Sequence, residues 1–98
     1  MIMKFEGHNK AQSYLKVYDD GVITFISYTT MIAKIDEDGW LTVVNWYGSN
    51  TTIRHIGWFA KWINKNINVC GENNLCWQDL KDMYDRGYRY NVITGEID

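Results

Sequence analysis

The first half of the chain carries the residue pattern of β-strands. Short apolar and β-branched runs lie at residues 14–18, 22–27, 29–35 and 40–46. Asp and Gly mark the turns at residues 19–21 and 36–39, where Asp bonds the local backbone and Gly tolerates a positive φ. This pattern predicts a three- to four-stranded antiparallel β-meander over about residues 14–46. Residues 22–27 are predicted to form a central strand, because their apolar run is nearly continuous.

The second half changes to the period of a helix. Ser49, Asn50 and Thr51 are N-cap candidates, and apolar residues then recur every three or four positions. A long helix is predicted over about residues 52–66, with its core side formed by Ile53, Ile56, Phe59, Ala60, Ile63 and Ile67. After a loop at residues 68–74, a shorter helix is predicted over about 75–86. Its expected core residues are Leu75, Leu80, Met83 and Tyr84.

These elements predict a single α+β domain over residues 1–98, in which the meander packs against the two helices. A short strand at residues 2–6 and a β-like tail at 88–97 complete the expected elements. The length fits one domain. The N-terminus lacks the apolar stretch of a signal peptide, so we expect a cytoplasmic protein, in a bacterial host cell if the resemblance described below holds. Cys70 and Cys76 are therefore expected to be free thiols.

No catalytic or metal-binding constellation is readable, so we expect no enzymatic activity, no metal and no cofactor. His8 lies in a polar N-terminal turn, and His55 is predicted on the long helix, away from its core side; both are expected at or near the surface. Five residues separate Cys70 from Cys76, which matches neither a zinc knuckle nor a thioredoxin-type pair. Phosphate-binding loops and nucleophile motifs are missing from the sequence.

The aromatic content changes this picture. Five Trp, seven Tyr and three Phe exceed what one thin core needs, so some rings are expected at the surface. Opposite the core side of the long helix, residues at i, i+4 spacing form a cationic and aromatic stripe of Arg54, Trp58, Lys61, Trp62 and Lys65. Trp and Arg anchor protein interfaces, and the same mixture suits single-stranded nucleic acid. We predict this stripe to be the partner-binding site.

Two other interpretations of the stripe stay open. The second helix or residues 88–90 could fold over Trp58 and Trp62, which would make both rings part of the core. The acidic row of the second helix, formed by Asp79, Asp82 and Asp85, is expected to be a solvated face, or else to pair with the basic stripe. The net charge of −2 argues against a general nucleic-acid binder.

Two segments resemble a pattern in small phage and prophage proteins of unknown function. Residues 27–33 read Ser-Tyr-Thr-Thr-Met-Ile-Ala, and residues 51–56, after Tyr-Gly-Ser-Asn, read Thr-Thr-Ile-Arg-His-Ile. The pattern runs Ser-Tyr-x-Thr-x-Ile-Ala and then Thr-Thr-x-Arg/Lys-His-Ile, and the resemblance covers roughly residues 22–67. It implies that the second segment serves as helix cap and core, and that the protein is of viral or mobile-element origin.

Small accessory phage proteins without an enzyme site commonly bind a host protein. The resemblance therefore implies an anti-CRISPR-type inhibitor, which would bind a bacterial host protein or ribonucleoprotein complex stoichiometrically, with a CRISPR effector as the specific version. One alternative is a single-stranded nucleic-acid-binding module that uses the stripe. The other is a self-associating structural protein, because an exposed aromatic face favours a homodimer. No membrane partner is expected.

Overall fold

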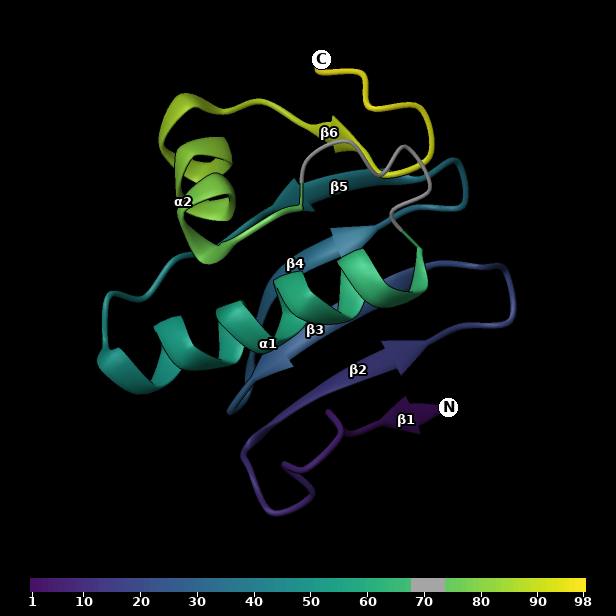
Figure 1. The fold of residues 1–98 in the computed structure, drawn as a ribbon. Coiled ribbons are helices and arrows are strands. Elements are labelled where there is room, and N and C mark those ends of the chain that lie inside the picture. The colour runs from purple at the N-terminus through teal and green to yellow at the C-terminus, as the bar shows by residue number, and fades with distance from the viewer. Residues whose placement is uncertain (68–73) are drawn as a thin grey trace.

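The computed structural model describes residues 1–67 and 74–98 and shows a six-stranded antiparallel sheet covered on one face by two helices (Figure 1). The strands follow one another in sequence order, so the first and last strands form opposite edges of the sheet. The elements are β1 (Ile2–Met3), β2 (Ser13–Val17), β3 (Ile23–Ser27), β4 (Thr30–Ile35), β5 (Trp40–Val43), α1 (Asn50–Asn66), α2 (Trp77–Arg86) and β6 (Tyr90–Asn91).

The predicted α+β class is confirmed, with β3 inside the sheet between β2 and β4. The predicted number of strands is too low. Four strands form the meander, and β1 and β6 each add a two-residue edge strand. These edge strands fall within the short strand expected at residues 2–6 and the β-like tail expected at 88–97, which the predicted three- to four-stranded meander did not count. The predicted loop at 68–74 and the state of Cys70 fall on residues 68–73, outside the described residues.

Strand register sets which side chains enter the core. Leu15 pairs with Phe25, Phe25 with Ala33 and Ala33 with Val43, and this row is buried beneath the helices. The ring of Phe25 stacks on that of Phe59 from α1, with centroids 4.6 Å apart. Since neighbouring residues of a strand point to opposite faces, the alternate positions lie on the face away from the helices.

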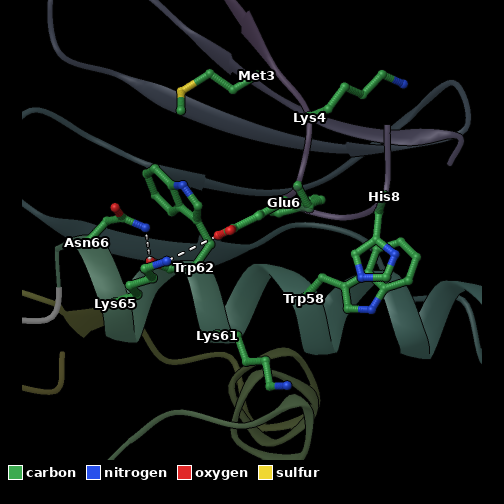
Figure 2. A pocket seen from close by; sticks show the side chains of 10 residues that line it. Met3, Lys4, Glu6, His8, Trp58, Lys61, Trp62, Lys65 and Asn66 are labelled. Atoms are coloured by element: carbon green, nitrogen blue, oxygen red, sulfur yellow. Dashed lines mark hydrogen bonds and ion pairs between the residues drawn. The ribbon is translucent and has the colours of Figure 1, made fainter. Parts of the chain in front are cut away.

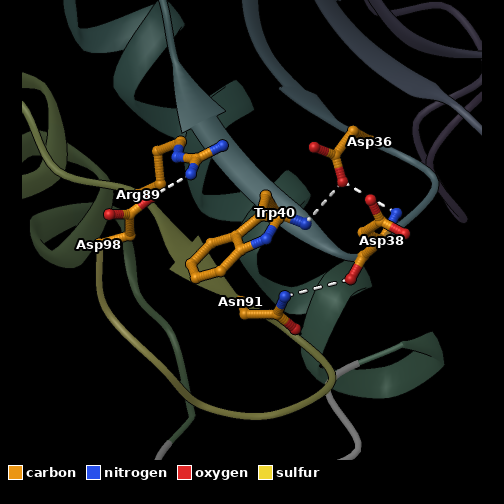
Figure 3. Close-up of polar contacts among 6 residues, drawn as sticks. All are labelled: Asp36, Asp38, Trp40, Arg89, Asn91 and Asp98. Carbon is orange, nitrogen blue, oxygen red and sulfur yellow. Dashed lines mark hydrogen bonds and ion pairs between the residues drawn. The ribbon is translucent and has the colours of Figure 1, made fainter.

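The turn before β5 fastens the last strand to the sheet (Figure 3). The carboxylate of Asp36 accepts hydrogen bonds from the backbone N–H groups of Asp38 and Trp40, at 2.9 and 3.0 Å. The Asn91 side-chain amide donates to the Asp38 carbonyl at 3.1 Å. The predicted turn at residues 36–39 is thus present, and it also holds β6 in place.

The cap predicted for the long helix is confirmed, with Ser49 as the N-cap residue. Its Oγ accepts from the backbone N–H of Thr52 at 3.2 Å, and the helix begins at Asn50, two residues before the predicted start. Four of the six predicted core residues are buried, whereas Ile53 and Ile67 are only half-buried and Ile67 lies just beyond the end of the helix. The buried side chains of α1 are Thr52, His55, Ile56, Phe59, Ala60 and Ile63.

The placement predicted for His55, away from the core side, is wrong. His55 follows Thr52 by three positions and precedes Phe59 by four, so it lies on the buried stripe of the helix. An imidazole tolerates this position because Ser27, a polar residue of β3, faces it. His8, in contrast, lies in an N-terminal turn as predicted, where its backbone N–H donates to the carbonyl of Phe5.

The second helix starts at Trp77, two residues later than predicted. Its N-cap is Cys76, whose backbone N–H donates to the Asp79 carboxylate at 2.8 Å, and Gly87 ends it in a left-handed conformation, which glycine adopts without strain. The prediction that Tyr84 enters the core is wrong, since its side chain is 42% exposed. The buried residues of α2 are Leu80 and Met83, whereas Tyr84, close to the C-terminal end of the helix, stays exposed.

Among the described residues, no helix is both long and apolar enough to cross a membrane.

Candidate binding groove between the N-terminal turn and α1

The predicted stripe of α1 faces the N-terminal segment of the chain. Its cations Arg54, Lys61 and Lys65 are exposed, whereas Trp58 and Trp62 are half-buried and pack against the core. The two tryptophans are thus neither fully exposed nor fully in the core. The segment that packs on Trp58 is the N-terminal turn, which the sequence pattern gave no reason to expect there.

The ring of Trp58 is held between three other rings. The imidazole of His8 stacks on the indole, with centroids 3.7 Å apart and planes 12° from parallel. Phe5 approaches the same indole at 6.3 Å, and His55 approaches it at 5.0 Å. Such ring pairs add stability beyond the area that they bury. Trp58 therefore ties the N-terminal turn to α1 and fixes one wall of a groove.

The groove encloses about 460 Å³ (Figure 2). Four of the five stripe residues line it, and Arg54 does not. The lining consists of Met3, Lys4, Phe5, Glu6 and His8 from the N-terminal segment and of Trp58, Lys61, Trp62, Lys65 and Asn66 from α1. The lining thus combines aromatic rings with three lysines and one carboxylate. A cavity of this size with apolar walls and a few charged groups is typical of a binding site.

One ion pair joins the groove's two sides. Lys65 Nζ lies 3.2 Å from a carboxylate oxygen of Glu6, and the two side chains are 72% and 90% exposed. Exposed pairs of this kind contribute only about 0–1 kcal/mol to stability. Among the described residues, Arg54 and Lys61 have no ion pair. Lys61 is therefore open to an incoming ligand at the groove, and Lys65 is held only by the weak pair with Glu6.

The acidic row of α2 does not neutralise the stripe. Asp82 pairs with Arg86 and accepts a hydrogen bond from the Tyr88 hydroxyl at 2.8 Å, and Asp85 pairs with Lys81. Asp79 is occupied at the N-cap of its own helix. The alternative in which these acids pair with the stripe is thus wrong, because each acid has a partner on α2 or directly next to it. Burial, together with the bond to Asp82, raises the pKa of Tyr88.

Next to the groove, His55 forms a buried link between α1 and the sheet. Its Nδ1 lies 2.9 Å from the Oγ of Ser27, and both residues are buried. Burial lowers the pKa of His55, and the neighbouring charges of Arg54 and His8 lower it further. The imidazole is therefore neutral at pH 7. This pair has the residue types of a nucleophile and its base, but its burial makes it a structural bond between helix and sheet.

Metal binding finds no support in the structure. Within residues 1–67 and 74–98, no three His, Cys, Asp or Glu side chains gather closely enough to hold an ion. The one described cysteine, Cys76, is a free and exposed thiol, as predicted.

Comparison with known proteins places the chain in a family. The sequence profile described as "Family of unknown function (DUF8033)" matches residues 2–74, which is well over half of the chain, so the chain belongs to this family. The match includes the N-terminal segment and α1, the two sides of the groove. No curated protein and no solved structure matches the chain.

Proposed function

We propose that this member of the DUF8033 family acts by binding a partner protein, with the groove beside α1 as the contact site. The observation that carries the proposal is the pair Trp58 and Trp62, held half-buried on one helix next to Lys61 and Lys65. Large rings on a rigid helix lose little conformational freedom on binding, and such rings dominate the energy of protein interfaces. The stripe predicted from the sequence is thus retained as the binding site, without Arg54 in the groove itself.

The charges of the groove favour an acidic partner segment with an apolar anchor. Lys4, Lys61 and Lys65 outnumber the single carboxylate of Glu6. A partner carboxylate could take the place of Glu6 on Lys65 at small cost, since that ion pair is exposed. An apolar side chain of the same segment would then bury itself against Trp62. A partner of this kind gains specificity from charge and affinity from the ring.

The specific form of the proposal is inhibition of a bacterial host defence complex, with a CRISPR effector as the target. Its support is the resemblance of residues 27–33 and 51–56 to small phage and prophage proteins. Such an inhibitor acts in the cytoplasm of the host cell and works stoichiometrically, by covering a surface of the effector. Its effect should therefore saturate once the two proteins are equimolar.

The groove is tested with tagged full-length protein as bait in bacterial lysate. The variant Lys61→Glu/Lys65→Glu reverses two charges at the groove, and Lys16→Glu/Lys34→Glu reverses two charges on the far face of the sheet as a matched control. We expect one protein to be captured by the wild type and the control and lost from the groove variant. Capture that survives the groove variant would show that the groove is not the contact.

The host-defence form needs a second measurement. If the captured protein is a nucleic-acid-guided nuclease, its cleavage of target DNA is followed while the purified chain is added. Inhibition that is complete near an equimolar ratio, and absent with the groove variant, supports the proposal. Undiminished cleavage at several-fold excess would refute the inhibitory function while leaving the groove as a binding site.

A further inference from the structure

The sheet has a face that the helices leave uncovered. Both helices lie on one side of it (Figure 1), and the residues that alternate with the buried ones point to the other side. Across this open face runs one row of paired residues, in which Lys16 is the partner of Thr24, Thr24 of Lys34 and Lys34 of Thr42. Both lysines of the row are exposed.

The strands that form this face carry no negatively charged side chain. None of the six described strands contains an Asp or a Glu, and their only charged residues are Lys16 and Lys34. Neither lysine forms an ion pair with any described residue. The carboxylates lie mainly in the turns at residues 19–20 and 36–38 and along α2, while Asp98 at the C-terminus is paired with Arg89, which lies over the Trp40 ring at one end of this face. A protein with a net charge of −2 thus presents one surface on which only positive charge occurs within the strands.

Two aromatic residues flank Lys16, one within β2 and one just after its end. Tyr14, Lys16 and Tyr18 are two residues apart, so their side chains share the open face. Lys4 Nζ lies 5.6 Å from the centroid of the Tyr14 ring, and Lys16 Nζ lies 5.5 Å from that of Tyr18. Tyr18 is 43% exposed and Tyr14 is half-buried. The open face therefore offers two rings, each with a lysine ammonium over it.

We propose that this open sheet face binds single-stranded nucleic acid. Lys4, Lys16 and Lys34 would meet the phosphates, and bases would stack on Tyr14 and Tyr18. Rings interleaved with cations on an exposed sheet are the arrangement that accepts a strand without regard to its sequence, because every base has a flat face and every nucleotide a phosphate. The site shares only Lys4 with the lining of the groove and goes beyond the proposed function.

Two other locations or occupants fit less well. On the α1 stripe, the His8 ring stacks on Trp58 with centroids 3.7 Å apart, which is a closer contact than the lysines make with Tyr14 and Tyr18, at 5.6 and 5.5 Å. A second copy of the chain, placed face to face on the sheet, would set the Lys16 and Lys34 row against an identical row, and like charges in contact repel. An acidic protein surface has the right charge but makes no use of two separate ring faces. It is kept as an outcome of the experiment.

The test is fluorescence anisotropy of labelled oligonucleotides of deoxythymidine and of uridine, titrated with the full chain. Binding should weaken as salt is raised, with a slope of about −0.7 for each phosphate contacted. With three lysines engaged, affinity should fall roughly twentyfold between about 50 mM and about 200 mM salt. A polyglutamate chain and a DNA duplex serve as competitors. Neither should displace the single strand at comparable concentration.

Charge-matched variants locate the site. Lys16→Gln/Lys34→Gln should weaken binding and reduce the salt slope by about 1.4, which corresponds to two lost phosphate contacts. Lys61→Gln/Lys65→Gln removes the same charge from the helix side and should leave the slope unchanged. Tyr14→Leu and Tyr18→Leu keep apolar bulk but remove the ring, and each should weaken binding about tenfold. Thermal melts check that every variant is folded.

Several results would overturn the proposal. One is no change in anisotropy at the lowest salt. Another is an equal loss of affinity in the double variants Lys16→Gln/Lys34→Gln and Lys61→Gln/Lys65→Gln. This result would mean that net charge rather than the open face governs binding. Displacement by polyglutamate would point to an acidic protein partner instead. Because the variants of the groove and of the open face do not overlap, failure of this proposal leaves the groove proposal standing, and the reverse also holds.

Discussion

The Oγ of Ser27 lies 2.9 Å from the Nδ1 of His55 and joins β3 to α1 inside the protein. The two residues are 28 positions apart in the sequence and belong to the two segments that resemble the phage pattern. Their hydrogen bond satisfies one hydroxyl and one ring nitrogen that burial would otherwise leave unpaired. At least this part of the pattern therefore has a structural purpose, independent of any partner.

The pKa of His55 makes stability depend on pH. The ordinary pKa is 6.5, and burial lowers it in the folded protein. Below pH 6.5 the unfolded chain therefore binds a proton that the folded chain does not, so stability is full above this pH and falls as the pH drops toward the folded pKa. Urea unfolding from about pH 7.5 to about pH 5 should show this loss.

The contribution of His55 is isolated by comparing two variants. His55→Gln should have a flatter pH profile than the wild type, because the perturbed group is gone. His8→Gln, which removes the other histidine, should retain most of the slope. Identical profiles for the wild type and His55→Gln would show that the imidazole does not titrate with a lowered pKa.

Two buried serines at paired positions should respond oppositely to removal of the hydroxyl. Ser13 is the cross-strand partner of Ser27, and its buried Oγ has no hydrogen-bond partner among the described residues. Ser13→Ala should leave stability unchanged or raise it by up to about 1 kcal/mol. Ser27→Ala should lower stability by about 1–3 kcal/mol, because the buried Nδ1 of His55 loses its hydrogen-bond partner. Denaturant unfolding gives both values. An equally large loss in Ser13→Ala would mean that this hydroxyl is satisfied in solution.

The stack of His8 on Trp58 should be measurable as a coupling energy. Trp58→Ala should destabilise the protein by about 2 kcal/mol, less than the 3–5 kcal/mol typical of a fully buried ring. In a double-mutant cycle with His8→Ala, the coupling should be about 0.5–1.5 kcal/mol. The matched cycle of His8→Ala with Trp62→Ala should give a value near zero. Zero coupling in the first cycle would show that the N-terminal turn does not rest on α1.

Two glycines with similar backbone angles should differ in their tolerance of alanine. Gly87 has φ 72° and an added Cβ would meet nothing within 4 Å, so Gly87→Ala should lose only about 1–2 kcal/mol, from backbone strain. Gly39 has φ 92°, and its Cβ would lie 2.8 Å from Ile93 Cδ1 and 3.0 Å from Asn91 Oδ1. Gly39→Ala should therefore be the more destabilising in thermal melts.

A second change tests the steric part of that difference. Ile93 is largely exposed, so Ile93→Ala by itself should have little effect, and in the Gly39→Ala protein it should recover part of the lost stability. No recovery would assign the loss to the backbone angle, or to the displaced Asn91, rather than to contact with Ile93.

Local patterns in the sequence were enough for the main elements. The turns at residues 19–21 and 36–39 and the β-branched runs between them predict the meander, because hairpin pairing is decided by residues close in sequence. Ser49 and the apolar spacing after it predict α1 in the same way. Gly87 likewise predicts the end of α2, because few other residues adopt its left-handed conformation.

The candidate sites depended more on tertiary contacts. The spacing of Trp58, Lys61, Trp62 and Lys65 was enough to place them on one helix face, but the sequence held no sign that residues 3–8 would form the opposite wall of a groove. Nor did it show that the lysines of β2 and β4 would meet in one row across Thr24. The periodicity of a segment states which of its own faces is apolar, and it says nothing of what packs there.

The sequence by itself therefore determined the α+β class, the positions of the meander and the two helices, and the residues that cap them, because each follows from interactions within a few residues. Only the tertiary structure decided that His55 is buried on Ser27, that Trp58 lies under His8, and which face of the sheet stays open. These outcomes depend on register and packing between segments far apart in the chain, and no local pattern encodes those contacts.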